Sequence, residues 1–342
     1  MSPDAFATAG PFVHEAVFYR SAEQYLASLV PFVRIGLGAG EPVLVAVPGA
    51  NLGLIRDGLG VDAERIRLVD MSRAGRNPSR IIPWVLHAFV DEFPEQRVRV
   101  IGEPVWPERS VLEYPVCVQH EALINEAFAG REATILCPYD ADRLDDVALI
   151  DAERTHPVLC EGGSRWTSSR YGGPVETAER FNQPLPDPPA SARSFLFTRS
   201  TLSEVRQMVR RVAESASVRA DHQAESASMR ADHQVESAGF AGSRLDEFLL
   251  AVHEVAANSV THGGGGGTLY VWIDADRLVC EIRDGGHVTN PMAGRLPVAG
   301  DCERGRGLLY VNYTCDLVQV HTRPGATTTR LHRRGQRLPT AA

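Results

Sequence analysis

The sequence contains no lysine, and all 35 of its basic side chains are arginines. A phosphate-binding P-loop needs a lysine after its glycines, and protein kinases of the eukaryotic type need a lysine on a strand. The absence of lysine therefore excludes both classes. Any nucleotide chemistry in this chain has to come from a site that works without lysine.

Long apolar runs, patterned cysteines and an excess of basic charge are also missing. No run approaches the roughly 20 apolar residues of a membrane span, and no signal peptide is recognisable, so we expect a cytoplasmic protein with no membrane partner. The six cysteines contain no CxxC pair, which is typical of reduced thiols. A net charge of −8 argues against direct binding of nucleic acid.

The first half of the chain alternates between short apolar strands and helical segments, and we assign residues 12–163 to one domain. Strands separated by helices predict an α/β domain with a mostly parallel sheet. Ligands of such sheets bind beyond the carboxyl ends of the strands. The predicted strands cover 14–19, 41–49, 65–70, 97–106 and 132–140, and the predicted helices lie between them, including one at 79–93.

Residues 164–193 are rich in glycine, proline and serine and predict a linker. A second domain follows at 194–334. Within it, an eleven-residue unit is repeated at 214–235, and eleven residues make three helical turns, so the repeat predicts a longer helix whose faces keep their direction. A neutral duplication and a partner-binding or homodimerising arm are both open interpretations of the repeat.

The helix predicted at 245–263 carries the most informative pattern. Glu254, Asn258 and His262 are spaced four residues apart and share one face of that helix. A carboxylate and a carboxamide next to the glycine run 263–267 can hold a hydrated Mg²⁺ and the phosphates of a nucleotide. A polar stripe on a surface helix is the alternative for this helix taken alone.

Further polar and glycine motifs follow in chain order. A strand ends in Asp284, whose carboxylate can accept a hydrogen bond from the amine of adenine. A loop at 287–304 is a predicted lid. The remaining positions are Gly286, which lets the backbone approach the base, Gly305 and Gly307, which place amide groups at a helix start where phosphate is favoured, and Thr328 or Thr329, which can support Asp284.

These motifs in this order resemble the GHKL (Bergerat) ATPase fold, and within it the anti-sigma-factor serine kinases. The resemblance covers about 194–334 and implies an α/β sandwich, ATP and Mg²⁺ as cofactors, and Glu254 as the general base. The partners it implies are a sigma factor, an anti-sigma antagonist protein, or both. The sequence departs from the family at His287, where a further glycine is usual, in the inserted repeat and in the length of the glycine run.

The first domain resembles the MEDS sensory domain, a RecA-like fold without a functional P-loop. The resemblance rests on HEAVFY (14–19), GEPVWPERS (102–110), CPYD (137–140) and THP (155–157), and it implies sensing of a small molecule. Strand-end packing is the alternative for these residues, and a metal site made of Cys117, His120, His156 and Cys160 is another. The candidate ligand contacts are His14, Tyr19, Glu103, Trp106, Glu113, Tyr139 and His156.

Together, the two resemblances imply a signal-responsive bacterial regulator, an ATP-binding anti-sigma factor with serine kinase activity gated by the sensory domain. A non-catalytic switch that binds a partner is the main alternative. A sensor histidine kinase is a further alternative, although the ADHQ of the repeat lacks the features of a phospho-acceptor box. Neither the sensed ligand nor the partner is specified by the sequence.

Overall fold

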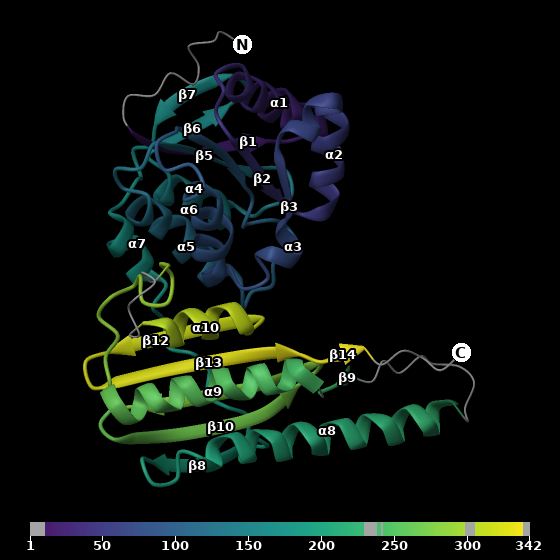
Figure 1. Cartoon of the computed structure of the whole chain (residues 1–342), viewed down its shortest axis with the longest axis vertical. Helices are drawn as coiled ribbons and strands as arrows, with labels where there is room; N and C mark the ends of the chain where they lie inside the picture. Colours follow the sequence, from purple (N-terminus) through teal and green to yellow (C-terminus); the bar gives the residue numbers. More distant parts are fainter. Residues whose placement is uncertain (1–10, 229–237, 241, 298–304, 338–342) are drawn as a thin grey trace. The chain divides into compact units, whose positions relative to one another are not determined.

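The computed structural model of the chain describes residues 11–228, 238–240, 242–297 and 305–337 (Figure 1). They form two units, one of residues 11–181 with 295–297 and one of residues 182–294 with 305–337. Within these described ranges, no helix combines the length and apolar character needed to cross a bilayer. Each unit is described separately below.

The first unit is built on a seven-stranded sheet in the order β3-β2-β4-β5-β1-β6-β7. All neighbouring strands run parallel except the last pair, β6 and β7, which confirms the predicted mostly parallel α/β sheet. The strands are β1 Phe12–Tyr19, β2 Val43–Val47, β3 Arg67–Asp70, β4 Val98–Gly102, β5 Ala133–Asp140, β6 Val158–Glu161 and β7 Ser164–Thr167.

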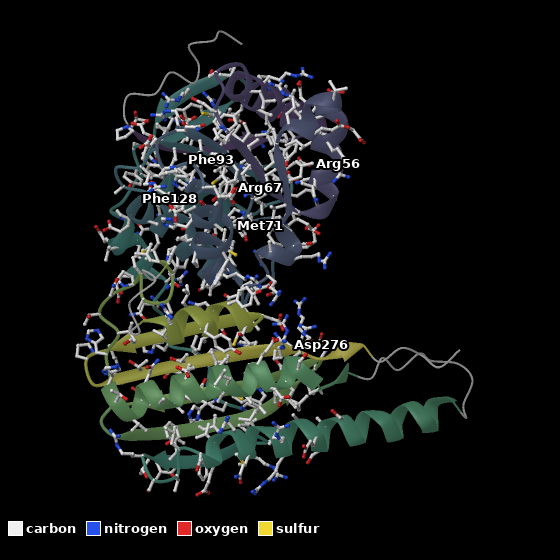
Figure 2. The ribbon with its side chains drawn as sticks, in the orientation of Figure 1. Arg56, Arg67, Met71, Phe93, Phe128 and Asp276 are labelled. Carbon is white, nitrogen blue, oxygen red and sulfur yellow. The ribbon has the colours of Figure 1, made fainter. Side chains whose placement is uncertain are left out.

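Helices cover both faces of this sheet. Apolar side chains of α1 and α2 form one core with alternate residues of β1 and β2, such as Val17 and Val45. The residues between them point to the opposite face, where α5 and α6 lie. Met71 and Phe128, labelled in Figure 2, are fully buried. The helices are α1 Ala22–Gly38, α2 Gly49–Leu59, α3 Met71–Ala74, α4 Ala88–Val90, α5 Tyr114–Ala127 and α6 Asp146–Thr155, with a 3-10 turn at Gly60–Arg65.

The single helix expected at 79–93 is broken into three pieces. A 3-10 turn covers Pro78–Arg80, a π-helix covers Ile82–His87, and α4 is one short turn. Pro83 lies in the second position of the π-helix and has no amide hydrogen to donate, so the regular ladder of hydrogen bonds is interrupted there.

Part of the segment expected to be a linker forms regular structure. Residues 164–167 form β7, and Pro174–Arg180 form α7, where the Ala178 carbonyl accepts a hydrogen bond from Gln119 of α5. The next residues belong to the second unit. The Asn182 side chain and the backbone of Thr322 exchange two hydrogen bonds, at 2.7 and 2.9 Å.

In its described residues, the second unit contains a five-stranded antiparallel sheet in the order β12-β13-β11-β10-β8, three helices and a separate pair of short strands. One apolar cluster joins α8, α9 and α10 to one face of the sheet, with Phe197, Phe248 and Leu269 among its fully buried members. This confirms the predicted α/β sandwich. The elements are β8 Arg193–Thr198, α8 Glu204–Ser228, α9 Gly242–His262, β10 Gly266–Asp274, β11 Arg277–Asp284, α10 Arg306–Thr314, β12 Leu317–Arg323 and β13 Ala326–Arg334.

Helix α8 contains the first copy of the repeat and the start of the second, which fits the predicted lengthening of this helix (Figure 1). The rest of the second copy, at 229–235, lies outside the described residues. Beyond it, a short pair joins β9, Ala238–Gly239, to β14, Gln336–Arg337. Helix α9 then begins at Gly242, three residues before the predicted start at 245.

Close approaches of other backbone segments account for part of the glycine run 263–267. A side chain at Gly266 would place its Cβ 2.2 Å from the Phe197 carbonyl oxygen of β8, and one at Gly267 would lie 2.7 Å from the Arg283 carbonyl oxygen of β11. Gly264 and Gly265 have φ values of +90° and +97°. The run therefore forms the start of a central strand and is more than the flexible connector that its composition indicates.

Candidate functional site

Helix α9 places Glu254, Asn258 and His262 in one row, as predicted from their spacing. The opposite face of α9 is buried in the core through Val252, Val255 and similar residues. Glu254 and Asn258 are half-buried and His262 is exposed. The side chains of Glu254 and Asn258 form no hydrogen bond or ion pair with another described residue, so both are available to a ligand.

Asp284, at the end of β11, is held against the carboxyl end of α9. The Ser259 hydroxyl donates to Oδ2 of Asp284 at 2.6 Å, and the Gly286 amide donates to Oδ1 at 2.7 Å. A Cβ at Gly263 would lie 2.6 Å from the same carboxyl group, so only glycine allows this approach. Each carboxylate oxygen has two lone pairs, so each can accept a second hydrogen bond.

The two glycines predicted at a helix start lie at the start of α10. Gly305 is its N-cap, with φ of +91°, a conformation that glycine adopts without strain. A Cβ at Gly307 would lie 2.7 Å from Oε2 of Glu254. The first amide groups of α10, which have no partner within the helix, therefore lie beside the Glu254 carboxylate. A helix start of this kind favours the negative charge of a phosphate.

Of the two threonines of β13 predicted to support Asp284, only Thr329 lies on the same face of the sheet as Asp284. Asp284 is paired with Thr327 in the sheet register, and Thr329 lies two residues further along the same face. Thr328 points to the opposite face because side chains alternate along a strand. Thr327 and Ser259 were missed by the sequence analysis. Counting back by two from the buried Leu331 would have marked Thr327 and Thr329 as the inward-facing pair.

The segment predicted as a lid is described up to residue 297, and residues 298–304 lie outside the described residues. Its first part is tied to α10, since the Asn312 side chain donates to the Gly294 carbonyl at 2.8 Å. Asn290 stabilises a turn by accepting from the Met292 amide at 2.9 Å.

In the first unit, two of the candidate ligand contacts line a cavity of about 360 Å³ at the carboxyl ends of β1, β2 and β5. Tyr19 and Trp106 are part of its wall, and Arg109 lies over the Trp106 ring at 3.7 Å. This volume is in the range of small-molecule sites. The remaining lining residues are Arg20, Ser21, Ala22, Tyr25, Pro48, Ala50, Asn51, Leu54, Pro107, Glu108, Asp140, Asp142 and Arg143.

Glu103 lies buried behind this wall. Its carboxyl group accepts hydrogen bonds from Tyr19 at 3.3 Å, from Tyr25 at 3.2 Å and from Asn51 at 2.9 Å. Burial raises the pKa of Glu103 to about 8, although these donors act in the opposite direction. Tyr25 and Asn51 were missed because nothing in their local sequence distinguishes them from other helical residues.

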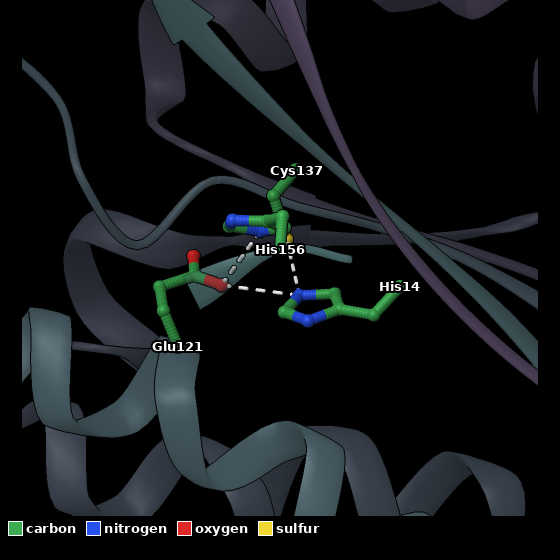
Figure 3. Close-up of side chains that lie close together, drawn as sticks. All are labelled: His14, Glu121, Cys137 and His156. Carbon is green, nitrogen blue, oxygen red and sulfur yellow. Dashed lines mark hydrogen bonds and ion pairs between the residues drawn. The ribbon is translucent and has the colours of Figure 1, made fainter. Parts of the chain in front are cut away.

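The other candidates lie elsewhere in the first unit. His14 and His156 meet Glu121 and Cys137 in a buried cluster (Figure 3), and the Tyr139 ring contacts His156 edge-on at 5.6 Å. Glu113 accepts from the amide and hydroxyl of Ser110 and stabilises a turn. The expected ligand contacts therefore divide between the cavity and the buried cluster, and Glu113 belongs to neither.

The four residues whose spacing suggested an alternative metal site do not lie together in the structure. They are Cys117, His120, His156 and Cys160. Cys160 belongs to the core on the α1 face of the sheet, where its thiol donates to Glu15. His156 lies on the other face. The spacing of His156 and Cys160 joins residues on opposite sides of one sheet, whereas Cys117 and His120 both belong to α5.

Comparison with known families is consistent with this division of the chain. Residues 13–157 match the family model described as MEDS, the MEthanogen/methylotroph, DcmR Sensory domain. Residues 198–333 match the family model described as Histidine kinase-like ATPase domain. The chain has a MEDS domain followed by a histidine kinase-like ATPase domain. An ATPase domain of this GHKL type implies nucleotide binding, usually with Mg²⁺.

Whole-chain comparisons add little to these family matches. No curated protein matches the chain. Among solved structures, the Acinetobacter baumannii histidine kinase AdeS matches with 10% identity over 65% of this chain and 95% of its own, at a TM-score of 0.21. A similarity at that TM-score carries no argument about this protein.

Proposed function

We propose that the chain is an ATP-binding anti-sigma factor with serine kinase activity, gated by its MEDS domain. The observation that carries this proposal is the convergence of three features in the ATPase domain. The free side chains of Glu254 and Asn258, the anchored carboxylate of Asp284 and the glycine-rich start of α10 lie around one end of α9.

The residues present fit a nucleotide with Mg²⁺. Asn258 offers an unpartnered amide oxygen for the ion, and the start of α10 offers amide groups to the phosphates. Asp284 retains lone pairs for the adenine amine, and Gly286 keeps the backbone beside it free of a side chain. His262, which is exposed at the end of α9, can contact the nucleotide from the solvent side. Thr327 and Thr329 of β13 lie on the same face of the sheet as Asp284 and can support its carboxylate.

Glu254 is the proposed general base. It takes the proton of a seryl hydroxyl as that oxygen bonds to the γ-phosphorus, while the bond to the bridging oxygen breaks and ADP leaves. Mg²⁺ supplies charge stabilisation for the leaving phosphates. Because Gly307 has no side chain, the Glu254 carboxylate stays open beside the phosphate-binding helix start. A positioned base contributes typically 10²–10⁴-fold.

The signal in this proposal is a small molecule bound in the cavity between Tyr19 and Trp106, with Glu103 behind it. Its occupancy changes ATP binding or partner access in the ATPase domain. The connecting segment supports such gating because α7 is bonded to α5 of the MEDS domain, while the next residue but one, Asn182, is bonded to β12. The proposed partners are a sigma factor and an anti-sigma antagonist, and the proposed location is the cytoplasm.

The test is transfer of the γ-phosphate from labelled ATP to a serine of the cognate antagonist. Glu254→Gln should keep ATP binding and lose the transfer. ATP binding without transfer in the wild type would identify a non-catalytic switch. Acid-labile phosphate on this chain itself would identify a histidine kinase.

A further inference from the structure

Four buried side chains in the MEDS domain form a cluster that the sensory cavity does not use (Figure 3). His14 lies on β1, Cys137 on the neighbouring strand β5, Glu121 on α5, and His156 directly after α6. Each residue is at most 2% exposed. One ligand atom from each lies within 4.8 Å of all the others.

The distances in this cluster suit a single central ion. Oε2 of Glu121 lies 3.2 Å from Nε2 of His14 and 3.2 Å from Nε2 of His156, and the Cys137 sulfur lies 3.4 Å from Nε2 of His14. Tetrahedral ligands at metal distances of about 2.0–2.3 Å are separated from each other by roughly 3.3–3.6 Å. These three distances are therefore close to the spacing that a tetrahedral ion requires, and the other pairs of ligand atoms lie within 4.8 Å.

The surroundings of the two histidines fix which ring nitrogen carries the hydrogen. Nδ1 of His156 lies 2.9 Å from the Ala152 carbonyl oxygen, an acceptor, so Nδ1 is the donor. The Asn125 amide nitrogen donates to two backbone carbonyls, at 2.8 and 3.2 Å, which turns its oxygen toward Nδ1 of His14 at 3.2 Å. In both neutral rings, Nε2 is therefore a lone pair that faces the cluster.

In this arrangement, the hydrogen-bond acceptors of Glu121 and of the two histidine rings face one another. Among the described residues, no donor completes a hydrogen bond to either carboxylate oxygen of Glu121 or to Nε2 of His156. A buried carboxylate without donors is costly. One added proton could serve only one of the two ring nitrogens, whereas a metal ion accepts an electron pair from all four groups at once.

We propose that His14, Glu121, Cys137 and His156 bind one divalent transition-metal ion, of the class represented by Zn²⁺. Nitrogen and sulfur ligands select such ions over Mg²⁺ and Ca²⁺. The carboxylate and the thiolate together balance the double positive charge, which a buried site needs. The thiol proton of Cys137 passes to solvent as the sulfur–metal bond forms.

The site is closed because the protein supplies all four ligands and none of them is exposed. Closed sites of this kind hold structural ions. The ion would join β1, β5, α5 and the end of α6, so its loss should loosen the MEDS domain. This inference is independent of the proposed kinase activity and can be tested without ATP.

The test is titration of the full-length, chelator-treated chain with Co²⁺, followed by displacement with Zn²⁺. The expected result is one Co²⁺ per chain with a thiolate-to-cobalt charge-transfer band. Cys137→Ser should lose that band. Asn125→Ala keeps all four ligands but frees the His14 ring, and should weaken binding roughly 10–100-fold. Cys117→Ser and Cys160→Ser are matched controls, since both remove a buried thiol of the same domain and should keep the band.

Zn²⁺ should also raise the thermal unfolding midpoint of the wild type and the two control variants, but not that of Cys137→Ser. A folded wild-type chain that binds no Co²⁺ would overturn the proposal. Full retention of the band in Cys137→Ser, or its loss in both controls, would also overturn it, because the ligands would then be different residues. If Cys137→Ser does not fold, the affinity of Asn125→Ala for Co²⁺ decides between the outcomes. Weaker binding supports the site, and binding equal to that of the wild type overturns it.

Discussion

Replacing Asp284 by asparagine should weaken ATP binding without unfolding the ATPase domain. Each oxygen of Asp284 accepts one hydrogen bond from the protein, at 2.6 Å from Ser259 and 2.7 Å from Gly286, which leaves lone pairs for the adenine amine. In Asp284→Asn one oxygen becomes an amide group and the charge is lost. A hydrogen bond to a charged group contributes about 1.5–3 kcal/mol, which corresponds to roughly 10- to 150-fold in affinity.

The assay is calorimetric titration of the full-length chain with ATP in excess Mg²⁺ at fixed salt. Ser259→Ala, which removes one donor to Asp284 but keeps the carboxylate, should show a smaller loss. Asp274→Asn is the control, because Asp274 is an exposed carboxylate at the far end of β10. If Asp284→Asn binds ATP within about twofold of the wild type with an unchanged near-ultraviolet circular dichroism spectrum, Asp284 does not contact the base.

Three further predictions follow from single contacts. Gly307→Ala should leave ATP affinity intact but lower phosphate transfer by up to about 100-fold. The new Cβ would lie 2.7 Å from Oε2 of Glu254 and displace the Glu254 carboxylate. An unchanged transfer rate would contradict the role of Glu254 as general base. Gly266→Ala should lower the free energy of unfolding of the ATPase domain, measured in urea, by about 1–3 kcal/mol. The new Cβ would lie 2.2 Å from a backbone oxygen of β8 that cannot rotate away. An unchanged urea midpoint would contradict this prediction. Burial raises the pKa of Glu103 from 4.5 to about 8, so between these pH values the unfolded chain has released a proton that the folded chain keeps. The contribution of Glu103 to stability is therefore present below pH 4.5 and is lost as the pH rises to 8. Glu103→Gln should remove this pH dependence of the unfolding midpoint.

Residues that depend on local spacing were predictable from the sequence. The row of Glu254, Asn258 and His262 follows from the helical period, and Asp284 follows from its place at the end of an alternating strand. Ser259 and Thr327 were not predictable in the same way. Their roles depend on how α9 meets β11 and on the register between β11 and β13, which are tertiary properties.

In the MEDS domain, too, local spacing predicted only part of the site. The alternation of strands and helices predicted its sheet, and two of the cluster residues, His14 and His156, were chosen as functional candidates. Glu121 and Cys137 complete the cluster from segments more than 100 residues away from His14 in the chain. Spacing along the chain offered Cys117 and Cys160 only as alternative metal ligands, and the first is part of α5 outside the cluster while the second lies on the other face of the sheet.

The composition of residues 164–193 did not reveal the local structure of this segment. Glycine, proline and serine indicated an irregular connector, yet its first part forms β7 and α7. Its end is fixed to the outer face of the second sheet, where Arg283 pairs with Asp187 at 3.0 Å and Arg330 donates to the Pro186 carbonyl. The partners in these contacts lie about 100 residues or more further along the chain, so composition could not reveal them.

The proposed function requires that α9 and its neighbours bind ATP through Mg²⁺. The most direct test is calorimetric titration of the full-length wild type and of Asn258→Ala with ATP, each in Mg²⁺ and in a chelator of divalent ions. We expect binding by the wild type that depends on Mg²⁺ and is lost in Asn258→Ala. A folded wild-type chain that binds no ATP, or equal binding by both proteins, would contradict it.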